Sequence, residues 1–380
     1  MIRMSTAGII FSNLNTTTRN LLTEDRTVAA IPFACRYRLV DFSLSNMVNA
    51  EVANISIVTN YNYRSLRDHI GSGKDWDLAR HGAGIRVVSP YQNARHHTSA
   101  KVYSSHLEAL VDNGEALSTI HEDHVVICDS DIICNLDLTA VVALHDEKKA
   151  DITIVSVKER ENWEARSQRI CLSVEENDRI SDIVLSDRYD KKHEETALNI
   201  FVMRTEQLRG ILAEAAARNY SGLTRDVLMR HVKQARFYRY LHRGYYAFVT
   251  EFKDYYKSSM DLLRDPLARE GLLGIKERPI FTNVHNTAPA RYGEESVVKN
   301  SMIADGCTVD GRVENSILFR GVKIGRGSVV RNSILMGGTV IGNNVALDSV
   351  VADKDVVVSD GRHLAGCGEL PYFIPKKKRL

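Results

Sequence analysis

The chain has 380 residues, of which 44% are hydrophobic and 26% are charged, a composition typical of soluble globular proteins. Basic and acidic residues nearly balance at a net charge of +2, so no global field indicates nucleic acid as a partner. The sequence contains no apolar run of the roughly 18 residues that a membrane helix needs, and no secretory signal pattern. Six scattered cysteines without C-x-x-C spacing favour a reducing compartment. We therefore predict a cytoplasmic protein that binds neither nucleic acid nor membrane.

The first 264 residues alternate between short apolar runs and segments with helical spacing. The apolar runs, which we predict as buried strands, are Thr6–Phe11, Ile55–Thr59, Val125–Cys128 and Ile152–Val157. The predicted helices are Ser104–Ile120, Leu138–Lys149 and Glu206–Arg218. This alternation predicts a doubly wound, Rossmann-like α/β domain over residues 1–264. Ligands of such sheets bind beyond the carboxyl ends of the strands.

Two pairs of shorter strands interrupt this alternation, and we predict that each pair forms a hairpin at the edge of the sheet. The pairs are Arg169–Val174 with Arg179–Ser186, and Arg236–Leu241 with Tyr245–Thr250. A helix is predicted over Asp254–Arg264. The following stretch, residues 265–290, is rich in Gly, Pro and Asn, and we predict that it is a linker.

Residues 291–380 repeat a short phrase. The sequences NSMIADG, NSILFRG, NSILMGG and DSVVADK begin at Asn300, Asn315, Asn332 and Asp348, so the phrase recurs every 15 to 17 residues. Aliphatic residues between the phrases are spaced near six, which is the periodicity of a parallel β-helix. Asn or Gly at each corner accepts the left-handed backbone that the turn needs. We predict a hexapeptide-repeat, left-handed parallel β-helix.

One segment near the N-terminus indicates a family. Residues 33–46, FACRYRLVDFSLSN, closely resemble the F-G-G-x-[FY]-R-[IL]-[IV]-D-F-x-L-S-N stretch of the ADP-glucose pyrophosphorylases, also called glucose-1-phosphate adenylyltransferases. Residues 62–66 (NYRSL), 69–77 (HIGSGKDWD) and 255–263 (YYKSSMDLL) fit the same family. The resemblance implies a relative of enzymes that condense ATP with glucose 1-phosphate to ADP-glucose and pyrophosphate. Such chemistry needs a glycine-rich turn, cations and Mg²⁺ around the phosphates.

Several of the family's catalytic residues are missing here. Active members have G-G-x-G-T-R-L after the first strand, where this chain has SNLNTTTRN at residues 12–20. The phosphate-binding Lys of K-P-A corresponds to Val28, and the second metal-binding Asp corresponds to Phe248. The E-K-P motif is absent near residues 186–189, and SHLEA at residues 105–109 replaces G-T-A-x-A. The Asp of the family's G-D-H motif survives as Asp131, which is a possible metal ligand.

These losses resemble the GlgD-type subunit that accompanies a catalytic partner in some bacterial glycogen systems. We therefore predict a regulatory, largely non-catalytic subunit in a hetero-oligomer, in which Mg²⁺ serves the catalytic partner and this chain alone requires no cofactor. A heterotetramer is implied by the resemblance. The resemblance also implies a phosphate or sugar-phosphate effector bound by Arg38 and Arg320, since convergent cations would be needed.

Other interpretations remain open from the sequence. The chain could be an active sugar-phosphate nucleotidyltransferase with a rearranged site that uses Asp131. Alternatively, Asp131 could be a structural residue of a strand-end turn, and Arg38 and Arg320 could form structural salt bridges. His363 in the β-helix raises a third alternative, an acyltransferase with a histidine base.

Overall fold

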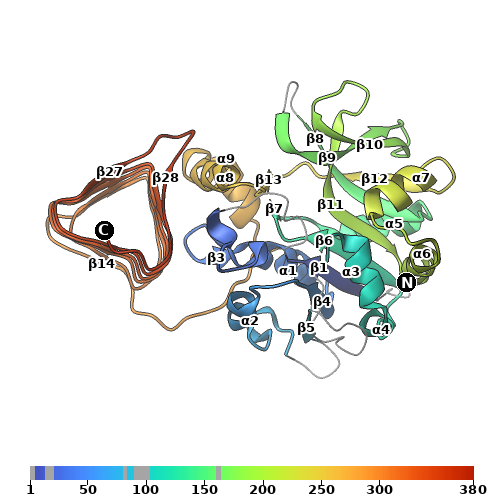
Figure 1. The fold of residues 1–380 in the computed structure, drawn as a ribbon, viewed down its shortest axis with the longest axis horizontal. Coiled ribbons are helices and arrows are strands. Elements are labelled where there is room, and N and C mark those ends of the chain that lie inside the picture. The colour runs from blue at the N-terminus through green and yellow to red at the C-terminus, as the bar shows by residue number, and fades with distance from the viewer. Residues whose placement is uncertain (1–4, 13–20, 80–83, 90–102, 160–163) are drawn as a thin grey trace.

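The structure is a computed structural model, and it describes residues 5–12, 21–79, 84–89, 103–159 and 164–380. An α/β domain and a triangular β-helix lie side by side (Figure 1), with α8 (Phe252–Arg264) and α9 (Pro266–Leu273) between them. Within the described residues, the helices are too short or too polar to cross a membrane. Helix α9 lies inside the 265–290 segment predicted as a linker.

Nine strands of the described chain form one mixed sheet in the α/β domain. The order is β10-β9-β11-β6-β1-β4-β5, and β8 pairs with both β11 and β12. Strands β5, β4, β1 and β6 are mutually parallel, whereas β11 runs antiparallel to β6 and β8. The strands are β1 (Thr6–Phe11), β4 (Asn54–Val58), β5 (Gly84–Val88), β6 (His124–Asp129), β8 (Ile152–Lys158), β9 (Glu164–Val174), β10 (Ile180–Arg188), β11 (Glu195–Arg204) and β12 (Phe237–Leu241).

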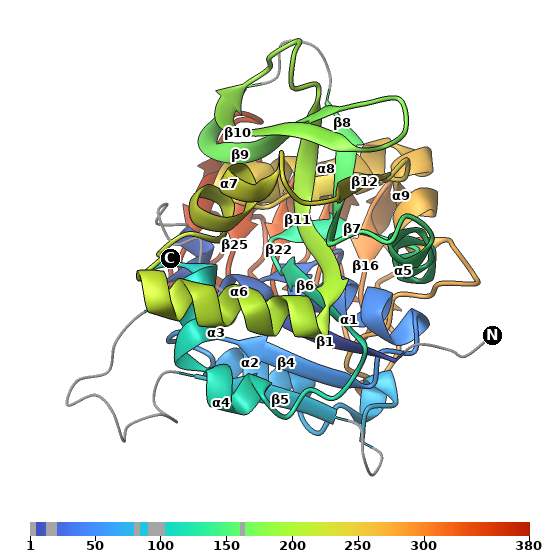
Figure 2. The same ribbon diagram turned by 90° about the vertical axis from the view of Figure 1, so that its right-hand side faces the viewer.

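Helices cover both faces of this sheet because its central strands are apolar on both sides. In β1, Ala7, Ile9 and Phe11 face one core with α3 and α6, and Ile10 faces a second core with α1, α2 and α5. Helices α3 and α6 lie on the side nearer the viewer in Figure 2. The helices are α1 (Leu39–Asn49), α2 (Arg64–Ile70), α3 (His106–Asp112), α4 (Gly114–Leu117), α5 (Leu138–Glu147), α6 (Thr205–Arg218) and α7 (Met229–His231). Short 3₁₀ turns lie at Leu21–Thr23, Val28–Ala30 and Lys74–Trp76, and a π-helix at Leu223–Leu228.

One predicted hairpin is confirmed and the other is wrong. Strands β9 and β10 pair antiparallel at the edge of the sheet, as predicted. Strand β12 instead pairs parallel with β8, and β13 (Tyr246–Phe248) pairs antiparallel with β7 (Ile132–Cys134). In this position β12 provides hydrogen-bond partners for β8 and buries Phe237 in the core. A local hairpin of β12 with β13 would have left β8 without these hydrogen-bond partners and Phe237 outside this core.

The predicted helix Ser104–Ile120 is divided in two at Asn113. The amide of Asn113 is buried and donates to the Ala109 carbonyl oxygen and the Tyr103 hydroxyl, both at 2.8 Å. A side chain that bonds nearby polar groups in this way competes with the helical backbone. Helix α3 therefore ends at Asp112, and α4 begins at Gly114.

The repeat region is a three-sided parallel β-helix, which confirms the predicted fold class. Its three flat sheets each contain five parallel strands among the described residues. Asn300, Asn315 and Asn332 have φ values of 42°, 47° and 47°, so the repeated asparagines do occupy left-handed corners. The first sheet contains β14 (Arg291–Tyr292), β17 (Thr308–Val309), β20 (Lys323–Ile324), β23 (Val340–Ile341) and β26 (Val357–Val358). The second contains β15 (Val297–Lys299), β18 (Arg312–Glu314), β21 (Val329–Arg331), β24 (Ala346–Asp348) and β27 (His363–Ala365). The third contains β16 (Met302–Ile303), β19 (Ile317–Leu318), β22 (Ile334–Leu335), β25 (Val350–Ala352) and β28 (Tyr372–Ile374).

The two domains share an apolar interface. Phe33 of β2 (Pro32–Phe33) and Phe42 of α1 belong to one buried cluster with Ile317 and Met336 of the β-helix. A short β3 (Tyr37–Arg38) pairs with β2 and leads into α1. The resemblance segment at residues 33–46 is therefore built into the domain interface.

Candidate functional site

The carboxyl ends of β1 and β6 lie next to each other, at the edge where ligands of such sheets bind. Phe11 and Asp129 end these paired strands, and the Ser130 N–H donates to the Phe11 carbonyl oxygen at 3.0 Å. Asp131 follows and is nearly buried. Residues 13–20, which replace the family's glycine-rich turn, lie outside the described residues.

Asp129 is held by two side chains at this edge. Its Oδ1 is 2.6 Å from His106 Nε2, and its Oδ2 accepts from Asn199 Nδ2 at 3.0 Å. Burial opposes the imidazolium form of His106, but the carboxylates of Asp129 and then Asp131 outweigh it and raise the pKa of His106. Both oxygens of Asp129 are therefore engaged within the protein. His106 lies in the segment that replaces the family's G-T-A-x-A stretch.

Phe248 lies beside Asp131, where the sequence comparison places a second metal-binding carboxylate. Strand β13 brings it there: Phe248 pairs with Ile132, and the Val249 N–H donates to the Asp131 carbonyl oxygen at 2.7 Å. The guanidinium of Arg169, from β9, stacks on the Phe248 ring at 4.0 Å from its centroid. A cation is thus fixed on the ring that replaces the carboxylate.

Arg169 is oriented by a second contact. Its Nη1 is 2.9 Å from Glu159 Oε1, and the Tyr246 hydroxyl donates to the other oxygen of Glu159 at 3.2 Å. The guanidinium of Arg169 is therefore held by two contacts, an ion pair with Glu159 and stacking on the Phe248 ring. The ring of Phe248 thus lies against an Arg169–Glu159 ion pair.

These residues do not fit Mg²⁺, which prefers several hard oxygen ligands. No group of three or more potential metal ligands occurs among the described residues. Asp129 is occupied by His106 and Asn199, and the guanidinium of Arg169 lies on Phe248, which pairs with Ile132, the residue after Asp131.

Val28 lies in the 3₁₀ turn that packs beneath the same edge. The next residue, Ala29, donates its N–H to the Ser12 carbonyl oxygen at 3.2 Å, so the turn lies directly beside the end of β1. Val28 packs against the interdomain apolar cluster and adds no charge to the site. The structure thus places Val28, Asp131 and Phe248 around the same edge of the sheet.

Arg38 and Arg320 approach one another across the domain interface. Arg38 Nη1 donates to the carbonyl oxygen and hydroxyl of Ser65, at 2.6 and 2.9 Å. Arg320 Nε is 3.1 Å from Asp305 Oδ1, and its Nη2 donates to the Asn283 carbonyl oxygen at 3.3 Å. Burial lowers the pKa of Arg38 to about 10; the carboxylates of Asp41 and Asp68 oppose this shift, and the charges of Arg26 and Arg320 add to it.

Lys354 and Arg26 extend this interdomain cluster of positive charge. Burial lowers the pKa of Lys354 to about 7, and the charges of Arg38 and Arg26 contribute in the same direction. Arg26 is neutralised by Asp353, with both carboxylate oxygens 2.7 Å from its Nη2. Among the described residues, neither Arg38 nor Lys354 forms an ion pair. They place positive charge between the domains, which suits an anion.

Comparison with known proteins places this geometry in a family. A family model described as "Nucleotidyl transferase" matches residues 20–167, and one described as "GlmU-like, C-terminal hexapeptide" matches residues 285–367. The chain is 32% identical over 358 residues to "Glycogen biosynthesis protein GlgD" of Bacillus subtilis (strain 168), covering 93% of this chain and 91% of that protein. It is 30% identical over 366 residues to "Glucose-1-phosphate adenylyltransferase" of Bacillus thuringiensis (strain Al Hakam), covering 95% and 93%. The protein of Bacillus anthracis with the same name shows the same identity and coverage.

The chain belongs to the glucose-1-phosphate adenylyltransferase and GlgD family. This confirms the resemblance and the fold class predicted from the sequence. At position 248 the resemblance implies a metal-binding carboxylate. This chain has Phe248 there, with the Arg169 guanidinium on its ring.

The sequence interpretation did not single out four charged or titratable residues that the structure places at these sites: Arg169, His106, Arg26 and Lys354. His106 lies in a segment aligned to a family motif, so a check of every titratable residue in that segment would have found it, whereas Arg26 lies outside those segments. Arg169 and Lys354 carried no local signal, since their roles depend on Phe248 and on the opposite domain. His363 lies exposed in β27.

Proposed function

We propose that this chain is the regulatory, largely non-catalytic subunit of a glucose-1-phosphate adenylyltransferase assembly in glycogen biosynthesis. The observation that carries this proposal is the Arg169 guanidinium on Phe248, beside Asp131. An aromatic ring that carries an ion-paired guanidinium offers no oxygen ligand for the metal that the ATP-dependent reaction needs. The fold is that of the family, while Phe248 stands where the resemblance implies the second metal-binding carboxylate.

The partner in this proposal is a catalytic adenylyltransferase subunit, which supplies the Mg²⁺ site, in a hetero-oligomer that we expect to be a heterotetramer. This chain would need no cofactor of its own. Its role would be to bind an anionic effector, a phosphate or sugar phosphate, between the domains. Arg38 and Lys354 would provide the positive charge, and Arg320 would complete the cluster from the β-helix.

Mixing experiments test this function. Pyrophosphate release is measured for this chain, for a catalytic adenylyltransferase subunit, and for their mixture, each with and without a sugar bisphosphate. We expect the mixture to differ from the catalytic subunit in maximal rate or in the effector concentration for half-maximal response. A mixture that behaves as the catalytic subunit does alone contradicts the proposal.

A double variant tests whether the altered effector response depends on the interdomain cluster. The Arg38→Ala/Lys354→Ala chain keeps the apolar interface with the β-helix, so it should still assemble, as size-exclusion chromatography of the mixture would show. We expect it to lose the altered effector response while retaining co-elution. An unchanged response would place the effector elsewhere.

Anion binding to the cluster should weaken as pH rises through about 7. The sign follows from Lys354: its pKa is lowered to about 7, so the side chain is charged below that pH and neutral above it. Sulfate is a suitable probe because its own charge is constant between about pH 6 and pH 8.5. Loss of one charge-assisted hydrogen bond should reduce sulfate affinity about 10-fold over that range, measured by calorimetry. Lys354→Arg should abolish the pH dependence, and a wild-type profile that is already flat would show that Lys354 does not contact the anion.

A further inference from the structure

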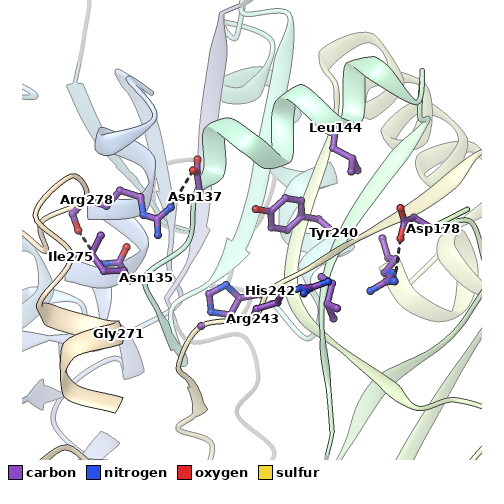
Figure 3. A pocket seen from close by; sticks show the side chains of 13 residues that line it. Asn135, Asp137, Leu144, Asp178, Tyr240, His242, Arg243, Gly271, Ile275 and Arg278 are labelled. Carbon is purple, nitrogen blue, oxygen red and sulfur yellow. Dashed lines mark hydrogen bonds and ion pairs between the residues drawn. The ribbon is translucent and has the colours of Figure 1, made fainter. Parts of the chain in front are cut away.

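A second cavity lies away from both the Asp131 edge and the interdomain cluster. Its volume is about 480 Å³, and it opens between α5, the carboxyl end of β12 and α9. Figure 3 shows the Tyr240 ring in the middle of this cavity, between the Asp137–Arg278 pair at one end and Asp178 at the other. A volume of this order accommodates a small metabolite.

The cavity walls carry buried polar atoms that find no hydrogen-bond partner in the described part of the chain. Asn135 is 2% exposed, and its Oδ1 accepts no hydrogen bond there, although its Nδ2 donates to the carbonyl oxygens of Leu272 and Arg278. The Nε of Arg278 is likewise buried and unpartnered, while its Nη1 lies 3.1 Å from Asp137 Oδ2. Buried donors and acceptors are rarely left unsatisfied in native proteins. One acceptor and one cationic donor therefore remain for a ligand.

A further positive charge lines the cavity. Arg243 is exposed and forms no ion pair with any residue that the structure describes. Arg239, by contrast, is a structural cation, since Asp178 and Glu195 each lie 3.1 Å from its guanidinium. Arg243 and Arg278 thus line the cavity together with the neutral side chains of Tyr240 and His242. Burial lowers the pKa of His242, which keeps its ring uncharged.

We propose that this cavity binds a small phosphorylated metabolite that also carries hydroxyl or amine donors. The phosphate would accept hydrogen bonds from Arg243 and Arg278, a geometry to which guanidinium groups are well suited. A donor on the ligand would satisfy Asn135 Oδ1, and the Tyr240 ring would support a flat base or a sugar face. A nucleotide and a sugar phosphate share this chemistry.

The position of the cavity connects it to both other sites. The two-stranded β7–β13 sheet has Asp131 and Phe248 at one end, and Asn135 and Gly244 lie beyond its other end. Asn135 also holds the start of the segment that leads to the β-helix, through the Leu272 and Arg278 carbonyl oxygens. A ligand that binds Asn135 would therefore contact a residue next to the β7–β13 strand pair. The same residue holds the segment that connects the two domains.

Direct binding measurements test the site. Calorimetric titration of the purified full chain with AMP, glucose 1-phosphate and inorganic phosphate distinguishes a nucleotide site, a sugar-phosphate site and a general phosphate site. We expect saturable binding of at least one probe, with affinity reduced about 10-fold or more in Arg243→Ala, because a charge-assisted hydrogen bond is lost. Arg243 is exposed, so this change should leave the fold intact.

A cavity-filling variant gives an independent readout. A side chain at Gly271 meets no atom closer than 3.9 Å at its Cβ, so Gly271→Phe can extend into the cavity without a clash at the backbone, and Gly271→Ala is the matched control. We expect Gly271→Phe to remove the binding that Arg243→Ala weakens and Gly271→Ala to preserve it, measured in the Arg38→Ala/Lys354→Ala chain so that the interdomain cluster does not contribute, with both variants melting cooperatively by circular dichroism. Binding that persists in Arg243→Ala and Gly271→Phe but disappears in Arg38→Ala belongs to the interdomain cluster and overturns the proposal. Failure of all three probes to saturate at millimolar concentration also overturns it.

Discussion

Purified by itself, this chain is expected to form ADP-glucose at least about 10⁴-fold more slowly than a catalytic adenylyltransferase. Two electrostatic contributions are missing, the cation at Val28 and the second carboxylate at Phe248, and each such contact contributes about 10² to 10³ in rate. The measurement is pyrophosphate release from ATP and glucose 1-phosphate at micromolar protein. Any trace rate should be unchanged in Asp131→Ala, which would identify it as a contaminating homologue. A wild-type rate that Asp131→Ala abolishes would instead support the active, rearranged nucleotidyltransferase.

Restoring the carboxylate alone should fail to restore turnover. In Phe248→Asp the new carboxylate would meet Arg169, whose guanidinium lies 4.0 Å from the present ring centroid, and would form an ion pair with it. The carboxylate would then be unavailable to a metal. Removing that cation in Phe248→Asp/Arg169→Met, together with Val28→Lys, should raise the rate above that of any of the single variants. Full activity in Phe248→Asp alone would contradict the role assigned to Arg169.

Breaking the buried ion pair between the domains is expected to be the most destabilising single substitution outside the apolar cores. Arg26 and Asp353 are 3% and 6% exposed in their side chains and lie 2.7 Å apart. Asp353→Ala would leave an uncompensated guanidinium in the interface, at a cost of about 3–5 kcal/mol in the free energy of unfolding. The double variant Arg26→Met/Asp353→Leu should recover most of this loss, because no buried charge then remains.

A second ion pair provides the matched control. Lys253 of α8 and Glu369 of the β-helix also bridge the domains, but their side chains are 49% and 81% exposed. Lys253→Ala should therefore change the free energy of unfolding by no more than about 1 kcal/mol. The comparison is made by urea denaturation followed by circular dichroism. Equal effects of Asp353→Ala and Lys253→Ala would show that burial does not govern the contribution of the pair.

The candidate site was only partly accessible from the sequence. Asp131, Val28 and Phe248 were found because each occupies a known place in a family motif. The predicted effector residues, Arg38 and Arg320, likewise came from aligned positions, and their assignment to an effector stays a prediction. The cation on Phe248 could not be inferred in this way, because Arg169 and Phe248 are separated by 79 positions in the chain (248 − 169) and meet only through the pairing of β13 with β7.

The sequence by itself determined the features that depend on local periodicity. The apolar runs at Thr6–Phe11 and Ile152–Val157 were strands because they are buried on both faces, and the repeated asparagines specified the corners of the β-helix. Only the tertiary structure decided which strand pairs with β8, how Arg26 meets Asp353, and where the cavity beside α9 opens. These features arise where segments distant in the chain satisfy each other's hydrogen bonds and charges, and no local pattern records that choice.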